Sequence, residues 1–279
     1  MDIIKYARVT GRGTPLLCLH SSGASSRQWD RLALRLADRF RVIAVDFGGH
    51  GKRPGWAANE EPSLQVEAEA LRPLLASAPE GMHVVAHSYG AAVALKLALD
   101  MPERIRSLAV YEPVLFRLIY DGFVHDRAGE EVVAAGTAIC NTFHAGDVEE
   151  SAYQFVDFWS GAGTFARLDD KQRVKVLERM SAVVDHFHAL FNDDTAIEEF
   201  RTLRVPTLLM NGTLSPACGR SITRRLALAL PSAWRHEFAG LGHLGPITRP
   251  DDVNSAIEQF LAGVTARHSL EPARFAFAA

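Results

Sequence analysis

Short runs of apolar residues, each followed by a polar or glycine-rich stretch, recur along the first part of the chain and return near its end. Such runs are typical of strands that are buried on both faces of a sheet. The segments between them carry apolar residues at helical spacing, for example Trp29, Leu32 and Leu36. Strands that alternate with helices predict a doubly wound, mostly parallel α/β sheet. We predict an edge strand at 3–9, buried strands at 16–19, 41–46 and 84–87, and further strands at 106–111, 205–210 and 234–238.

The alternation stops between residues 114 and 199, where the pattern predicts helices only. These helices span 130–143, 148–159 and 170–190; the helices of the α/β part span 26–38, 62–77, 91–99, 221–230 and 250–261. Pro73 should kink or shorten the helix that contains it, because proline lacks the backbone N–H. We therefore predict an α/β core made of residues 1–113 and 200–264, a helical insertion at 114–199 and a C-terminal tail at 265–279.

Composition and charge narrow the class of protein. Hydrophobic residues make up 48% and charged residues 23% of the 279-residue chain, as in a globular protein with a sizeable core. A net charge of −3 offers no reason to expect nucleic acid or an anionic membrane as a partner. Neither a signal peptide nor a membrane-spanning run is visible. Cys18, Cys140 and Cys218 fit neither a disulfide framework nor a zinc site. We expect a cytoplasmic protein that acts on a small molecule, without cofactor or metal; the oligomeric state stays open.

Ser88 lies where a buried strand meets a helix rich in alanine and leucine. A serine at such a sharp turn is typical of a nucleophile elbow, whose strained backbone needs small residues two positions before and after the serine. Ala86 and Gly90 occupy those positions, so the stretch reads A-H-S-Y-G where G-x-S-x-G is usual. The elbow directs the first amides of the helix at the group that the serine attacks.

His243 is the best candidate for the base that a serine nucleophile needs. It follows a strand in a glycine-flanked loop, late in the chain, as the order serine, acid, histidine requires. The loop after the first buried strand should supply a second oxyanion donor beside the amide of Tyr89; we choose the amide of Ser22 on position, with Ser21 as the alternative. Alternation along the strand points the His87 side chain away from Ser88.

Other features favour structural roles. His186 and His188 are two residues apart on a helix, so they face different ways and make a poor metal pair. The glycine-rich stretch at 48–52 lacks the pattern of a phosphate-binding loop. The aromatic residues of the helical insertion could line an apolar pocket, but most are expected to be ordinary packing; they are Phe143, Phe155, Phe158, Trp159, Phe165 and Phe187.

Taken together, these motifs resemble those of the α/β-hydrolases. The resemblance runs from about residue 14 to 261, apart from the insertion, and is carried by 20–23 with Trp29, 46–51, the elbow, 206–212 and 240–243. The family's first loop usually reads H-G-x, and Ser21 replaces that glycine here. The resemblance implies that the insertion is a cap that roofs the active site and determines substrate choice. The serine nucleophile argues against the haloalkane dehalogenases and epoxide hydrolases of the family, which use aspartate.

The acid of the expected triad is where the sequence departs from the family. Relatives place an aspartate after the strand at 207–210, in a stretch like G-x-x-D-P, whereas this chain has Ser215 there and no Asp or Glu between residues 200 and 236. The family's other site for the acid is the end of the preceding strand, which carries Glu112 here. We predict a triad of Ser88, His243 and Glu112, because a carboxylate both orients the histidine and stabilises its charged form. In the alternative, Ser215 alone orients His243.

These residues predict a serine hydrolase that cleaves a carboxylic ester of a small or medium apolar acid through an acyl-enzyme. Two alternatives stay open. One is hydrolysis of a carbon–carbon bond in a diketone, which capped relatives carry out with the same triad. The other is a non-catalytic ligand-binding protein on the hydrolase fold.

Overall fold

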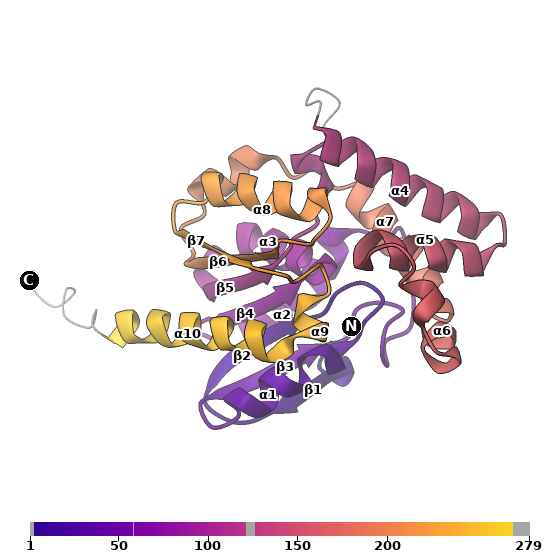
Figure 1. The fold of residues 1–279 in the computed structure, drawn as a ribbon. Helices are drawn as coiled ribbons and strands as arrows, with labels where there is room; N and C mark the ends of the chain where they lie inside the picture. Colours follow the sequence, from indigo (N-terminus) through magenta and orange to yellow (C-terminus); the bar gives the residue numbers. More distant parts are fainter. Residues whose placement is uncertain (1–2, 58, 121–125, 270–279) are drawn as a thin grey trace, which may run out of the picture.

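A seven-stranded sheet forms the centre of the computed structural model, which describes residues 3–57, 59–120 and 126–269 (Figure 1). The strand order is β1-β3-β2-β4-β5-β6-β7. Among the described strands, only β1 runs antiparallel to its neighbour, so the predicted doubly wound, mostly parallel sheet is confirmed. The strands are β1 (Ala7–Thr10), β2 (Thr14–Leu19), β3 (Phe40–Val45), β4 (Met82–His87), β5 (Ile105–Tyr111), β6 (Thr207–Gly212) and β7 (Ala233–Phe238).

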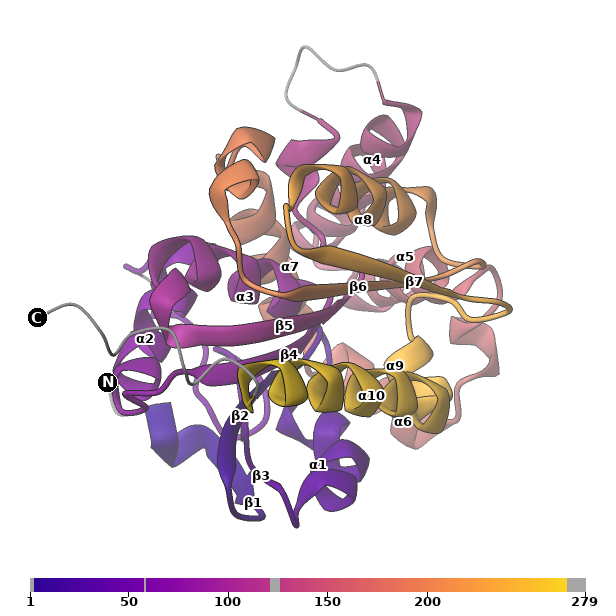
Figure 2. The ribbon, with the colours of Figure 1, turned by 90° about the vertical axis from the view of Figure 1, so that its left-hand side faces the viewer.

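Helices cover both faces of the sheet (Figure 2). On one face, Val84 and Ala86 of β4 pack with α2 (Leu64–Ala76), α3 (Tyr89–Asp100) and α8 (Ala217–Ala229). On the other, Val85 packs with α1 (Asp30–Leu36) and α10 (Pro250–Ser269). Every residue of β4 is therefore buried, which explains the short apolar run at 84–86.

The region between β5 and β6 is helical and includes no strand among its described residues. It holds α4 (Arg127–His144), α5 (Val148–Ser160), α6 (Asp170–Leu177) and α7 (Met180–Phe191), with 3-10 turns at Phe116–Leu118, Phe165–Arg167 and Ile197–Thr202. Helix α4 packs against α5 and α7, and the group lies beside one end of the sheet (Figure 1). No helix of the described residues has the length and apolarity needed to cross a bilayer.

The structure corrects several predicted boundaries. Residues Ile3–Tyr6 form a 3-10 helix rather than the start of the edge strand, because Ile3 is buried in the core beside α2. The segment 26–38 begins with a 3-10 turn, Ser26–Trp29, before α1. Pro73 lies inside α2, which runs from Leu64 to Ala76 and is slightly shorter than the predicted 62–77.

Two helical predictions were wrong in extent. The predicted helix at 170–190 is two helices, with a turn between Leu177 and Met180; α6 has no fully buried residue, whereas most of α7 is buried. Helix α10 continues to Ser269, so the predicted tail begins inside a helix, and 270–279 lie outside the described residues. A short helix, α9 (Gly245–Thr248), was not predicted.

Candidate active site

Ser88 occupies the sharp turn between β4 and α3. Its backbone has φ 55° and ψ −118°, a conformation that is costly for any residue with a Cβ. The Ser88 amide donates to Tyr111 O at 2.9 Å, which fixes the turn to β5. A Cβ at Gly90 would lie 2.5 Å from His20 O, so the close approach of α3 to the end of β2 requires glycine there. The strained turn is what the sequence pattern around Ser88 predicts.

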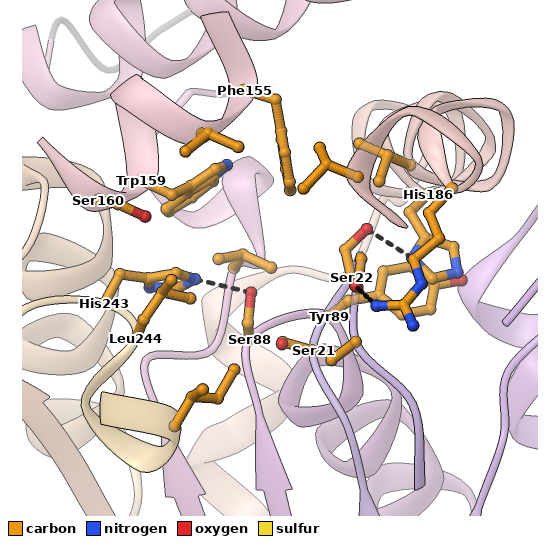
Figure 3. A pocket seen from close by; sticks show the side chains of 18 of the residues that line it. Ser21, Ser22, Ser88, Tyr89, Phe155, Trp159, Ser160, His186, His243 and Leu244 are labelled. Atoms are coloured by element: carbon orange, nitrogen blue, oxygen red, sulfur yellow. Dashed lines mark hydrogen bonds between the residues drawn. The ribbon is translucent and has the colours of Figure 1, made fainter. Parts of the chain in front are cut away.

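The three residues predicted as a triad form one chain of hydrogen bonds. His243 Nε2 lies 2.9 Å from Ser88 Oγ (Figure 3), and His243 Nδ1 lies 2.7 Å from Glu112 Oε2. All three residues are buried. The elements that carry them are far apart in sequence, but the parallel sheet places the ends of β4, β5 and β7 at one edge.

Glu112 follows β5 directly and, like Ser88, has a positive φ, 45°. Its Oε1 accepts a hydrogen bond from the amide of Gly212 at 2.8 Å and another from the hydroxyl of Ser215. A Cβ at Gly219 of α8 would lie 2.8 Å from Oε2, so glycine leaves room for the carboxylate. The alternative in which Ser215 orients His243 does not match this arrangement, because Ser215 binds Glu112 and Glu112 occupies the Nδ1 side of His243.

His87 lies nearer the site than strand alternation predicts. Its Nε2 donates to the backbone oxygen of His243 at 2.8 Å, and its Nδ1 accepts from Gln28 Nε2 at 3.1 Å. Burial and the nearby His243 keep the pKa of His87 well below its usual range, so the ring stays neutral. The Tyr111 hydroxyl donates to Gly242 O at 2.8 Å. These two bonds fix the loop that carries His243, and His87 does not contact Ser88 through any hydrogen bond of the described residues.

The loop after β2 presents the amide of Ser22 between two amides that are already hydrogen-bonded. The amide of Ser21 donates to Gln28 Oε1 at 3.0 Å, and the amide of Gly23 donates to His50 Nε2 at 3.0 Å. Between them, the Ser22 amide has no acceptor among the described residues. Of the two candidates that the sequence left open, Ser22 therefore has the N–H that can serve a ligand.

Two histidines that sequence reasoning did not assign to the site hold this loop. His50 Nδ1 donates to Gly48 O at 2.9 Å, so its Nε2 is the acceptor for Gly23, and burial lowers the pKa of His50 to about 4. His186 of α7 lies 2.9 Å from the Ser22 hydroxyl through Nδ1 and stacks on the ring of Tyr89 at 3.5 Å (Figure 3). His186 was predicted to be a poor metal ligand with His188; no group of three or more potential metal ligands occurs in the described residues. Only the tertiary fold could bring His50 and His186 together.

A cavity of about 200 Å³ opens beside Ser88, Tyr89 and His243 (Figure 3). Tyr89 is the first residue of α3, so its amide has no partner within the helix and is free to serve a ligand. Trp159 lies over His243 with ring centres 4.2 Å apart. Apolar side chains dominate the wall; they include Val114, Phe155, Val156, Trp159, Leu168, Val176, Val183, Phe187, Leu190, Leu244 and Ile247.

The helical insertion thus contributes three of its aromatic residues to the cavity, namely Phe155, Trp159 and Phe187. Phe158 lies against Trp159 and borders a separate hollow near Ser215. Phe143 and Phe165 are not among the described residues that line the cavity.

Comparisons with known proteins agree with this architecture. A pimeloyl-[acyl-carrier protein] methyl ester esterase of Aeromonas hydrophila subsp. hydrophila is 28% identical over 255 residues, which cover 90% of this chain and 96% of that protein. The α/β hydrolase MGS-M2, from a Medee basin deep-sea metagenome library, superposes with a TM-score of 0.77 at 15% identity. The esterase RhEst1 of Rhodococcus sp. ECU1013 superposes with a TM-score of 0.71 at 20% identity. Each structure match covers 92% of this chain and 94% of the other.

The sequence also matches the alpha/beta hydrolase family over residues 16–256, which is most of the chain. The matched region includes the strands β3, β4, β5, β6 and β7 and the hydrogen-bonded residues Ser88, Glu112 and His243. The resemblance seen in the motifs is therefore confirmed, and the protein belongs to the α/β-hydrolase family.

Proposed function

We propose that this hydrolase cleaves carboxylic esters of small or medium apolar acids, with Ser88 as nucleophile. The observation that carries the proposal is the hydrogen-bonded chain from Ser88 through His243 to Glu112, which opens into an apolar cavity. A buried carboxylate at Nδ1 keeps the proton on that nitrogen and leaves Nε2 free to accept the proton of Ser88. The tautomer needed for a general base is thus the one that this pairing favours.

In the proposed reaction, Ser88 Oγ attacks the ester carbonyl while His243 Nε2 takes its proton. The amides of Ser22 and Tyr89 hold the negative oxygen of the tetrahedral intermediate. His243 then protonates the departing alcohol, and Ser88 keeps the acyl group. Water, deprotonated by His243, attacks the acyl-enzyme; the acid leaves and Ser88 regains its proton. Glu112 stabilises the charged His243 in both halves.

We further infer that residues 114–199 act as a cap over the site. Phe155, Trp159 and Phe187 from this region line the cavity, where they would exclude water and contact an acyl chain. The names of the Aeromonas relative and of the Rhodococcus structure, both esterases, support ester hydrolysis in general. A cytoplasmic location is supported by the three cysteines, which are all unpaired.

The test is a screen of p-nitrophenyl esters of graded acyl length, run with the wild type, Ser88→Ala and Ser21→Ala. We expect turnover by the wild type that peaks at a short or medium chain, and nearly none by Ser88→Ala. Ser21→Ala should keep most activity, because its hydroxyl contacts Gln28 rather than His243. A diketone is assayed in parallel. Cleavage of the diketone alone would overturn the ester proposal, and binding without turnover of any compound would indicate the ligand-binding alternative.

A further inference from the structure

The cavity beside Ser88 contains one permanently charged side chain. Among the described residues that line it, Arg179 is the only arginine, lysine, aspartate or glutamate. His186 also lines it, but burial and the neighbouring His50 and His20 keep its pKa well below the usual range, so this ring is neutral. The wall of the cavity therefore carries a positive charge that no carboxylate among its described lining residues balances.

Arg179 lies where α6 gives way to α7, and its guanidinium is only partly paired. Nη1 donates to Gly23 O at 2.6 Å. Within the described part of the chain, the Arg179 side chain forms no ion pair and no second hydrogen bond. A guanidinium has five N–H donors, so four remain for a ligand or water. Its side chain is partly buried, and a charge withdrawn from water without a counter-charge is unfavourable.

The position of Arg179 places this charge near the proposed oxyanion site. Gly23, whose carbonyl it binds, directly follows Ser22. Arg179 Nη1 lies 2.6 Å from Gly23 O, consecutive Cα atoms are about 3.8 Å apart, and a carbonyl held by the Ser22 amide adds about one hydrogen-bond length. The guanidinium therefore lies within about 10 Å of such a carbonyl. A short aliphatic chain spans that distance, and the apolar wall of the cavity suits its methylene groups.

We infer that Arg179 binds a carboxylate of the substrate, so that the substrate is an ester carrying a second, ionised carboxyl group. This inference rests on the proposed ester hydrolysis and refines its substrate class: a carboxylate on the alcohol side leaves the acid apolar, whereas one on the acid side replaces the apolar acid by the half-ester of a dicarboxylic acid. The planar guanidinium of arginine can donate two parallel hydrogen bonds to the two oxygens of a carboxylate. The carbonyl of Gly23 has one oxygen and accepts from Nη1 alone. The carboxylate can belong to the acid or to the alcohol portion, and the two arms of the test separate these sources.

The test compares kcat/KM for charged and neutral esters of equal length. Methyl half-esters from succinate to suberate carry the carboxylate on the acid side, and acetyl esters of ω-hydroxy acids carry it on the alcohol side. The neutral partners have a methyl group in place of the carboxylate. The proteins are the wild type, Arg179→Gln, Arg179→Lys and Arg167→Gln. Arg167 is the matched control, because it is an exposed arginine of the same helical region that does not line the cavity.

We expect the wild type to prefer the charged ester in one of the two series. Arg179→Gln should remove about ten- to a hundredfold of that preference, the range for a hydrogen bond to a charged group. Arg179→Lys should keep part of it, and Arg167→Gln should keep all of it. No preference of the wild type in either series would overturn the inference. So would an equal loss on charged and neutral esters in Arg179→Gln, since Arg179 would then only support the Gly23 loop.

Calorimetric binding of free adipate separates this inference from the proposed function. If no ester is turned over but adipate binds and Arg179→Gln abolishes its binding, ester hydrolysis is refuted and the carboxylate site stands. If esters are turned over but adipate binds equally well to both proteins, the carboxylate site is refuted and ester hydrolysis stands.

Discussion

Glu112→Gln tests the acid of the proposed triad, which is the member whose position departs from the usual family pattern. In the wild type both carboxylate oxygens accept hydrogen bonds, Oε2 from His243 and Oε1 from Gly212 and Ser215. A glutamine amide has one accepting oxygen and one NH₂ group, so it satisfies only one side. If the oxygen faces Gly212, the NH₂ meets Nδ1 of His243 and forces the ring proton onto Nε2, which can then no longer accept the proton of Ser88.

The opposite orientation places the NH₂ against the Gly212 amide and leaves two buried donors facing each other. An unsatisfied buried donor costs about 1–3 kcal/mol, so the first orientation is favoured. The same kind of change in serine proteases lowers kcat about ten-thousandfold through the wrong tautomer. We therefore expect kcat/KM of Glu112→Gln to fall by about a hundred- to ten-thousandfold, equivalent to about 3–5 kcal/mol of transition-state stabilisation.

The assay is steady-state hydrolysis of the best ester from the acyl series, with circular dichroism to confirm that the variant is folded. Ser215→Ala is the matched control. It removes one hydrogen bond from Oε1 but leaves the carboxylate, its bond to Gly212 and its bond to His243. This control should lose less than about tenfold in rate, because the carboxylate that orients His243 and stabilises its charged form is still present. Near wild-type turnover by folded Glu112→Gln would refute the role of the carboxylate, and so would an equal loss in both variants.

Two further predictions concern the cavity and acid stability. Trp159→Ala should change the relative rates across acyl lengths, because the ring lines the cavity above His243. Phe158→Ala should lower thermal stability and leave the relative rates unchanged, because Phe158 borders the separate hollow. A change of acyl-length preference in Phe158→Ala alone would contradict the assignment. Burial lowers the pKa of His50 from 6.5 to about 4, so its neutral form contributes stability that is full above pH 6.5 and is lost as the pH falls toward about 4. The loss is at most about 3 kcal/mol of unfolding free energy. Measured by urea unfolding between pH 6.5 and about 4, the unfolding free energy should fall more steeply with decreasing pH for the wild type than for His50→Gln. Identical pH dependence of the two proteins would contradict this prediction.

Much of the architecture was accessible from the sequence because its signals are local. The apolar runs predicted the strands, since parallel strands covered on both faces are buried along their whole length, as β4 is, and are therefore mostly apolar. The small residues around Ser88 anticipated its positive φ. Glu112 was singled out because no carboxylate occurs near Ser215 and because the resemblance to the family implies the end of the preceding strand as the other site for the acid.

The remaining contacts depend on tertiary structure that no local pattern encodes. Arg179 contacts Gly23, which lies 156 residues earlier in the sequence. The break between α6 and α7, where Arg179 lies, contains no glycine or proline that would predict it. His87 was placed away from the site by strand alternation, which cannot foresee that the loop bearing His243 folds back over that face of the sheet. The roles of Arg179 and His87 could not be predicted from the sequence, because their partners become neighbours only in the folded structure.

Covalent labelling by a fluorophosphonate probe tests the central claim most directly, because the reagent reacts with a serine only when a neighbouring base activates it. Intact-mass and peptide mass spectrometry are compared for the wild type and Ser88→Ala, both verified as folded. We predict a single adduct on the peptide that contains Ser88, and none on Ser88→Ala. Folded wild-type protein that stays unlabelled, or an adduct at another residue that persists in Ser88→Ala, would contradict the assignment of Ser88 as the nucleophile.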